Sequence, residues 1–469
     1  MGDFSHTEPV VKPRRRRRIG RWLLLALVIA IAAFEGYAYL AMHRAASEAR
    51  AAGAPLTFTE IEAARTTWPD DRNGALVLLG IKDQLVQLAK TEEFANLPWL
   101  GCGASDLPLG ERWTDARRAE IDQFLQAAAP ELKQIDSLKN YEGGRMPFDP
   151  NADILLADYD IAFIRTAIKL KALQTVDRAM AGETDSVVDD LTILIRVGNV
   201  LAEEPTLIGS LVNVACNALT VHALQHTCAL ATLTPEQLKT IDGLLSGIEK
   251  SDRLYWGMLG ERALNRTARK AIMAQDRRNA IFPYVPGIHA WLMQDEATAL
   301  GMLNRMVEAT KAKPDGGLAA AHKIDQELQQ LSRILHPITT TTLPSLGRAF
   351  EINLNLTAQV RAARAAMAAE RFRIDRQQFP SALAELVPDY TDAIPLDPFD
   401  GKAMRYRLTP ERLVIYSIGD DMKDDGGDVA PKVNKNERAK DWGFVLLPPE
   451  LRGRAPAATT TPATQPADR

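Results

Sequence analysis

The chain has few of the residues that build disulfide, metal or nucleic-acid sites. It holds three cysteines in 469 residues, Cys102, Cys216 and Cys228, and none forms a CxxC pair. This sparse, odd set excludes a disulfide framework and a zinc or redox site built on paired cysteines, and it leaves room for one bridge. The net charge of −4 excludes a nucleic-acid binder that relies on a global positive field.

Aromatic residues and enzyme motifs are scarce as well. Aromatic residues make up 6% of the chain while alanine and leucine are plentiful, a balance that favours helices over strands. There is no G-x-S-x-G, no P-loop and no G-x-G-x-x-G that opens a helix after a strand. These absences remove the common hydrolase and nucleotide-binding classes, so we expect a protein without enzymatic activity.

A membrane-spanning helix is the strongest local signal. Arg14–Arg18 is a run of five arginines, and an unbroken apolar run from Trp22 to Phe34 follows it. A helix from Ile19 to Leu40 is about 33 Å long, enough to cross a bilayer's hydrocarbon core. Because basic flanks stay in the cytoplasm, we expect a single-pass protein of the cell inner (plasma) membrane, with a cytoplasmic N-terminus and an extracytoplasmic bulk.

A cleaved signal peptide is the alternative for this segment. Its apolar core would end at Phe34, and the small residues Ala38 and Ala41 could lie near a cleavage site. The rings of Tyr37 and Tyr39 suit the outer membrane interface, which favours a permanent anchor. Both interpretations export the bulk of the chain.

From about residue 57 to 335 the apolar residues recur at helical spacing. The predicted helices span 116–135 (kinked or divided at Pro130), 153–180, 185–201 and the strongly apolar 207–230. Thr234-Pro235-Glu236-Gln237 starts a further helix, with threonine as N-cap. We found no fixed repeat, so a bundle or an array of helix pairs is expected. Residues 314–344 have the composition of a hinge or linker around one polar helix.

The composition changes after Leu346. A long amphipathic helix is predicted as far as Arg376, followed by one short helical turn and a turn-rich passage. The predicted strands are 404–408, 413–418 and 441–446. A small α+β module over residues 345–447 is therefore expected.

Four short motifs follow one another in this module. They are Phe379-Pro380 after the helix, Leu396-Asp397-Pro398-Phe399-Asp400-Gly401, Tyr416-Ser417-Ile418-Gly419 with an acidic stretch, and Trp442 in the last strand. In this order they resemble the globular part of type II secretion major pseudopilins, over about residues 355–446. The resemblance implies an α+β fold and a role in a secretion-related or cell-surface assembly.

The N-terminus departs from that family. A pseudopilin starts with a basic leader that ends in glycine, followed by an apolar helix with glutamate at its fifth position. Here Gly20 is followed by Arg21-Trp22-Leu23-Leu24-Leu25, and a long helical region precedes the module. We therefore do not expect processing by a prepilin peptidase or assembly into a continuous pseudopilus.

An acidic loop is the best candidate site. Residues 420–428 hold five aspartates, with two glycines that allow a tight turn. Carboxylate oxygens are the ligands that calcium prefers. The similar pseudopilins bind calcium in this loop, and the resemblance places their loop aspartate at Asp421, with Asp425 or Asp428 as further ligands. The alternative is a solvated acidic turn.

His222 and His226 stand four residues apart and share a helix face near Cys216 and Cys228. The two cysteines lie roughly 120° to either side of that face, so the four side chains cannot converge on a zinc ion. We interpret the histidines as core or surface residues.

A basic stretch lies further along the chain. It comprises Arg262, Arg266, Arg269, Lys270, Arg277 and Arg278. We interpret it as a solvated helix face, with a groove for anionic lipid or polymer as the alternative.

Together these patterns predict a mainly α protein with one N-terminal transmembrane helix, a multi-helix extracytoplasmic domain and a small C-terminal α+β module. The predicted parts are a cytoplasmic basic tail (1–18), a transmembrane helix (19–42), a helical extracytoplasmic domain (43–335), a pseudopilin-like module (345–447) and a disordered tail (448–469). We expect an envelope scaffold or interaction protein whose partners are the lipid bilayer and other envelope proteins, not nucleic acid. The alternative is an exported enzyme or ligand-binding receptor with its site in the helical domain.

Overall fold

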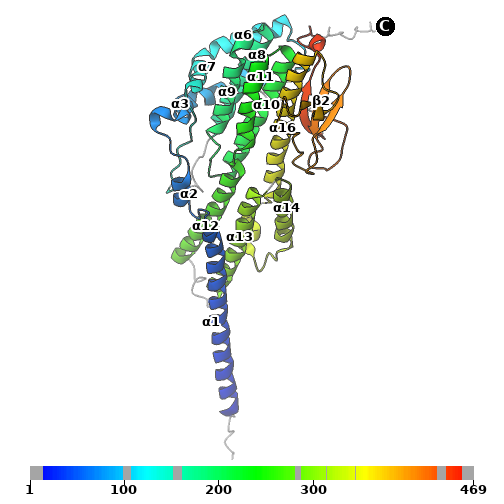
Figure 1. The fold of residues 1–469 in the computed structure, drawn as a ribbon. Coiled ribbons are helices and arrows are strands. Elements are labelled where there is room, and N and C mark those ends of the chain that lie inside the picture. Colours follow the sequence, from blue (N-terminus) through cyan, green and yellow to red (C-terminus); the bar gives the residue numbers. More distant parts are fainter. Residues whose placement is uncertain are drawn as a thin grey trace, which may run out of the picture. The chain divides into compact units, whose positions relative to one another are not determined.

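The structure is a computed structural model, and it is mainly helical with one small sheet (Figure 1). It describes residues 14–98, 107–151, 161–279, 287–312, 314–343, 345–429 and 440–456. The chain divides into two compact units. Unit 1 comprises residues 1–56, 262–304 and 326–344, and unit 2 comprises residues 57–261, 305–325 and 345–469.

Helix α1 (Arg14–Ala51) is one continuous helix that includes the predicted membrane segment. Its stretch from Gly20 to Ala51 is long and apolar enough to cross a membrane. Only 6% of the residues in the most apolar part of this stretch are buried. Among the described residues, α10 (Leu207–Leu230) is also long and apolar enough to cross a membrane, but 56% of the residues in its most apolar part are buried. Since α10 packs against α8 (Ala162–Ala181), α9 (Val187–Asn199) and α16 (Gly347–Arg376), it is a core helix, as the sequence predicted.

In unit 1 the C-terminal part of α1 packs against α13 (Ile288–Lys311), and α12 (Arg253–Asn279) contacts the chain just after α1. Arg262 of α12 is 1% exposed, and it donates to the carbonyl of Pro55 and, at 3.0 Å, to Asn304 Oδ1. Arg266 donates to the carbonyl of Leu56 at 3.4 Å. The prediction of a solvated basic face is therefore wrong for Arg262, because its guanidinium holds the chain after α1. The side chains at 269, 270, 277 and 278 lie outside the described ones.

The predicted linker at 314–344 contains two helices, α14 (Pro314–Gln330) and α15 (Pro337–Thr342). Ala321 and Ile324 of α14 are buried. Asp325 accepts hydrogen bonds from the N–H groups of Leu346 and Gly347, at 3.0 and 2.8 Å, and so holds the start of α16. The segment was misread because its glycines and prolines are typical of loops.

Unit 2 contains most of the helices. Those not yet given are α2 (Phe58–Ala64), α3 (Gly74–Gly80), α4 (Lys82–Leu88), α5 (Glu92–Asn96), α6 (Asp115–Ala127), α7 (Ala129–Asp136) and α11 (Pro235–Glu249). Short 3₁₀ turns lie at Asp70–Arg72, Ser137–Asn140, Thr184–Ser186, Leu383–Leu386 and Pro449–Leu451.

Several predicted helix ends are confirmed in unit 2. The predicted helix at 116–135 is divided into α6 and α7, with Pro130 in the first turn of α7. Thr234 caps α11 through a capping box with Gln237. Gly182 ends α8 in the left-handed conformation at φ 81°. The predicted beginning of that helix, residues 153–160, lies outside the described residues.

The sheet of unit 2 has three antiparallel strands in the order β1 (Arg405–Leu408), β2 (Leu413–Ser417) and β3 (Trp442–Leu446). All three were predicted. Tyr416 pairs with Arg405 on one side and with Gly443 on the other. The sheet packs on α16, as Figure 1 shows.

The predicted boundary between a helical domain and a separate C-terminal module does not coincide with this architecture. Helix α16 packs against α10 and α11, and residues such as Val360 and Phe444 share one hydrophobic cluster with Leu173 and Leu224. Small buried side chains on α16 allow this close packing. The buried alanines of α16 are Ala349, Ala358, Ala362, Ala363, Ala365, Ala366, Ala368 and Ala369.

The predicted start of a disordered tail at Pro448 is also wrong. Arg452 donates to Glu370 of α16 at 2.8 and 2.9 Å. The Gly453 N–H donates to the carbonyl of Ala229 at 3.1 Å. These contacts order the chain as far as residue 456, and residues 457–469 lie outside the described part.

Candidate functional site

The acidic loop predicted from the sequence connects β2 to β3, and Asp441 fixes its inner side. Asp441 is fully buried. Its Oδ2 accepts the N–H groups of Gly427 and Asp428 at 2.8 and 3.2 Å. Burial raises the pKa of Asp441 above its usual value, although these backbone donors oppose the rise. Gly427 adopts φ 80°, and a Cβ there would lie 3.2 Å from the Tyr416 ring. The loop is therefore shaped by its own backbone around one carboxylate.

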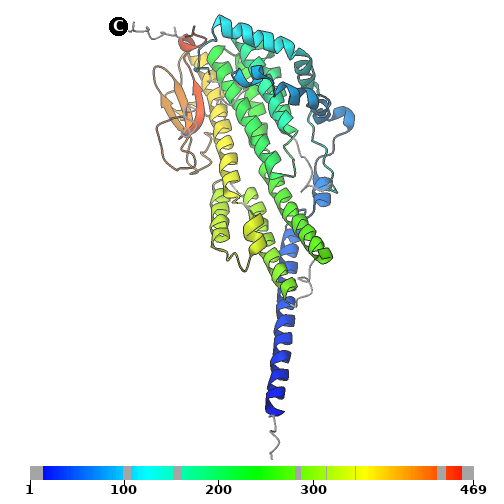
Figure 2. The same ribbon diagram turned by 180° about the vertical axis from the view of Figure 1, so that it is seen from behind.

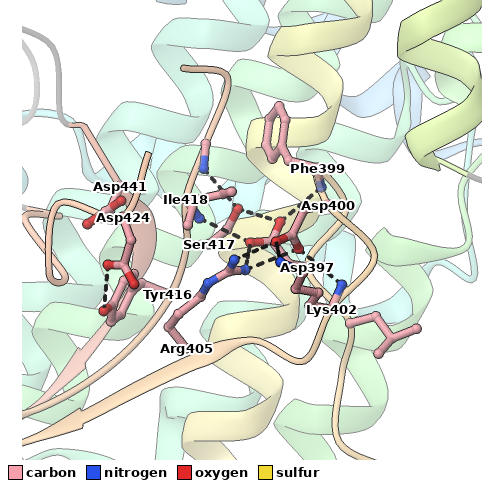
Figure 3. A network of polar contacts seen from close by, with 12 residues as sticks. Asp397, Phe399, Asp400, Lys402, Arg405, Tyr416, Ser417, Ile418, Asp424 and Asp441 are labelled. Carbon is pink, nitrogen blue, oxygen red and sulfur yellow. Dashed lines mark hydrogen bonds and ion pairs between the residues drawn. The ribbon is translucent and has the colours of Figure 1, made fainter. Parts of the chain in front are cut away.

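A second buried carboxylate, Asp397, fixes the turn that precedes β1. Figure 3 shows it at the centre of a network that joins this turn to the end of β2. Its oxygens accept from Ser417 Oγ at 2.8 Å, from the Ile418 N–H at 3.0 Å and from the Phe399 N–H at 2.9 Å. Arg405 pairs with it at 2.5 Å. These contacts tie the turn before β1 to the end of β2, and we call the network the Asp397 clamp.

Tyr416 and Asp424 form the outer part of the same region. The Tyr416 hydroxyl donates to Asp424 Oδ1 at 3.0 Å, and the two side chains point toward each other in Figure 3. Burial, reinforced by the Asp424 carboxylate, raises the pKa of Tyr416 to about 12. The tyrosine therefore stays neutral and acts as a hydrogen-bond donor.

The three predicted calcium ligands lie in this loop with different neighbours. Asp421 is exposed and accepts the Lys423 N–H at 3.0 Å. Asp425 pairs with Lys440 Nζ at 3.2 Å. The backbone N–H of Asp428 donates to Asp441. In the described part of the chain, no three His, Cys, Asp or Glu side chains are grouped so that they could hold a metal ion.

Of the histidine pair of α10, His226 is buried and His222 is partly buried. The rings of His222 and His226 meet edge to face with their centroids 4.8 Å apart. Burial lowers the pKa of His226 well below its usual value, and His222 adds to this effect. Cys216 and Cys228 are buried and free, while Cys102 lies outside the described residues. The interpretation of His226 as a core residue is confirmed.

Unit 2 carries a groove that the sequence did not reveal. Helices α4, α5, α6 and α7 line a cavity of about 960 Å³. Its floor includes Leu88, Leu97 and Phe124. Its lining carries the carboxylates of Asp83, Glu92, Glu93, Glu120 and Glu131. We call this cavity the acidic groove.

Arg117 is the single cation in the described lining of the acidic groove. Its guanidinium donates to Glu120 Oε2 and to the carbonyl of Asn96, both at 2.7 Å. Five carboxylates against one guanidinium leave the groove strongly negative. A negative cleft over an apolar floor attracts cationic groups and amphipathic segments.

No sequence pattern could have identified the acidic groove. Its carboxylates come from four short helices that are separated along the chain. Each helix contributes only one or two of them, as the solvated face of an ordinary helix does. Only the packing of the four helices places these residues around one cavity.

No family model, curated protein or solved structure matches this chain.

Proposed function

We propose that this protein is a membrane-anchored interaction protein of the cell envelope. The observation that carries the proposal is α1, whose long apolar stretch is uncovered by the rest of the chain. Burying such a surface in lipid is strongly favourable, whereas leaving it in water is costly. The arginines before it favour a cytoplasmic N-terminus, with the chain after residue 42 on the outer side of the inner membrane.

The acidic groove is the surface best suited to a partner. Glu92 and Glu93 are exposed at its rim, while the buried side chain of Phe124 contributes apolar surface. This combination fits a basic, amphipathic segment of another envelope protein, since rim charges steer the encounter and the apolar floor supplies affinity.

Cross-linking in native membranes, followed by capture of the full chain, tests this proposal. We expect captured partners to dissociate at high salt and to be lost in the Glu92→Lys/Glu93→Lys variant. The matched control is Asp70→Lys/Asp71→Lys, which reverses two exposed charges away from the groove. Equal capture by wild type and both variants would exclude the acidic groove as the partner site.

The resemblance of the C-terminal region to pseudopilins adds a second part to the proposal. A long helix packed on a small antiparallel sheet is compatible with that family's globular fold, and a link to type II secretion or a cell-surface assembly follows from the resemblance alone. Calcium binding by Asp421, Asp425 and Asp428 is part of the same proposal. It requires these side chains to turn toward one ion.

Thermal unfolding of the full chain with calcium and with a chelator tests whether the acidic loop binds calcium. The full chain is needed because α16 and the sheet share a hydrophobic cluster with the other helices of unit 2. We expect calcium to raise the unfolding temperature of wild type but not of Asp421→Asn/Asp425→Asn. Identical curves for wild type under both conditions would contradict calcium binding.

The volume of the acidic groove also suits a small-molecule site, so a ligand-binding receptor or an exported enzyme is the second candidate function. Its 960 Å³ lies within the range of small-molecule sites. A cationic small molecule such as spermidine would then stabilise wild type and fail to stabilise Glu92→Lys/Glu93→Lys. Equal stabilisation of both proteins by spermidine, or stabilisation of neither, would exclude this candidate function.

A further inference from the structure

The turn between α14 and α15 in unit 1 exposes two large apolar side chains. Ile334 is 81% exposed and Leu335 is 59% exposed. Arg333 beside them is exposed as well. Aliphatic side chains of this size contribute about 1.5–3 kcal/mol each when they are fully buried, so a surface that covers this turn gains stability.

The turn is held in a fixed shape by α13. Trp291 Nε1 donates to the carbonyl of Leu335 at 2.9 Å. Asp295, one turn further along α13, is fully buried and accepts the N–H groups of Ile338 and Thr339 at the start of α15. The partly exposed Trp291 side chain therefore lies beside the turn that carries the two apolar side chains.

Helix α13 runs beside the outer part of α1 and in the same direction, as Figures 1 and 2 both show. Asn304 Nδ2 donates to the carbonyl of Ala45 at 2.7 Å. Leu300 packs in one cluster with Ala45 and Ala49. These contacts fix which parts of the two helices lie at the same level.

This register places Trp291 close to the predicted outer interface of the membrane. Trp291 precedes Leu300 by nine residues, which is about 14 Å along a helix. The same distance back along α1 from its contact with Leu300 leads to about residues 36–40, where Tyr37 and Tyr39 stand. Ala38 at this level is fully buried, while Tyr37 and Tyr39 are exposed.

We propose that Trp291, Ile334 and Leu335 form a second membrane contact, which rests in the outer interface of the bilayer that α1 spans. Tryptophan prefers this interface, the aliphatic side chains enter the acyl boundary, and Arg333 reaches lipid phosphate. This second contact rests on the proposed function, because it requires α1 to span the membrane. Residues 262–304 and 326–344 of unit 1 are then held to the bilayer directly, in addition to their packing on α1.

Depth-dependent quenching in lipid nanodiscs tests this contact. Single cysteines at Ile334, Val28 and Met422 are introduced one at a time into the full chain with Cys102→Ser, and each is labelled with an environment-sensitive fluorophore. Cys216 and Cys228 are buried, so they do not react. Val28 reports the middle of α1, and Met422, which is 53% exposed in unit 2, is the water-exposed control. The nanodiscs contain phosphatidylcholine and phosphatidylglycerol, with a nitroxide either near the headgroup or near the chain end.

The label at Ile334 should lose most emission with the nitroxide near the headgroup, and the label at Val28 with the nitroxide near the chain end. The label at Met422 should be unaffected by either. If the label at Val28 is quenched while the label at Ile334, like that at Met422, is not, the second contact is excluded and the proposal of a membrane anchor is kept. If Val28 is not quenched, the anchor itself fails and the contact fails with it. A blue-shifted label at Ile334 that neither nitroxide quenches would show a protein neighbour, such as a second copy, and would overturn the proposal.

Discussion

Neutralising Glu370 should strongly destabilise unit 2. The Glu370 carboxylate is 2% exposed and accepts two hydrogen bonds from Arg373, at 2.9 and 2.8 Å, and two from Arg452, at 2.8 and 2.9 Å. The side chains of Arg452 and Arg373 are only 4% and 11% exposed, so water screens the charges poorly. Loss of one partner of a buried ion pair costs about 3–5 kcal/mol. Because glutamine keeps one acceptor oxygen, we expect Glu370→Gln to cost about 3 kcal/mol, near the lower end of that range.

The same group predicts a dependence on pH. Burial alone raises the pKa of Glu370, but the hydrogen bonds from Arg373 and Arg452 outweigh it, so the pKa in the folded state lies below the usual 4.5. Its stabilising contribution is therefore fully present above pH 4.5 and is lost as the pH falls through the lowered value. Wild type should lose this part of its stability in acid, and Glu370→Gln should not.

Urea unfolding of the full chain in detergent micelles, followed by tryptophan fluorescence, measures both effects. Arg452→Met and the double variant Glu370→Gln/Arg452→Met complete a mutant cycle. The double variant should be less destabilised than the sum of the single variants, because each substitution removes the same contact. A change below about 0.5 kcal/mol for Glu370→Gln, or equal acid sensitivity of wild type and variant, would refute this reasoning.

Three further substitutions or treatments have defined outcomes. Asp397→Asn removes a fully buried carboxylate from the clamp and should cost about 3 kcal/mol in urea unfolding, whereas the exposed control Asp389→Asn should cost little. Gly443→Ala places a Cβ 2.3 Å from a carbonyl oxygen of β2, and a thermal scan should show a loss of about 1–3 kcal/mol unless the strand pairing shifts. Burial raises the pKa of the Cys216 and Cys228 thiols to about 12, so neither should react with maleimide at neutral pH before urea unfolds the chain; rapid labelling of folded protein would contradict this.

Local signals in the sequence were sufficient for many single elements. The span of α10 was predicted to the residue because this stretch is apolar on almost all of its faces. The start of α11 was predicted from its capping box, and all three strands from alternation and turns. In each case the information lies within a few adjacent residues.

Long-range packing explains what the sequence did not show. Alanines on several faces of α16 gave no sign that this helix joins the core of the other helices, so a separate module was predicted. Arg452 lies just before a stretch rich in proline, alanine and threonine, and only its contact with Glu370 reveals that the chain there is ordered. The acidic groove was missed for the same reason, since it exists only where four helices meet.

Labelling of intact and lysed cells tests the membrane topology most directly. A cysteine at the exposed position Asp70 and another placed before the arginine run are introduced separately into the Cys102→Ser chain and treated with a membrane-impermeant maleimide. We predict that Asp70→Cys reacts on intact spheroplasts, that the N-terminal cysteine reacts only after lysis, and that alkaline carbonate does not release the protein. Release by carbonate, or protection of Asp70→Cys until lysis, would contradict a permanent anchor with an extracytoplasmic bulk.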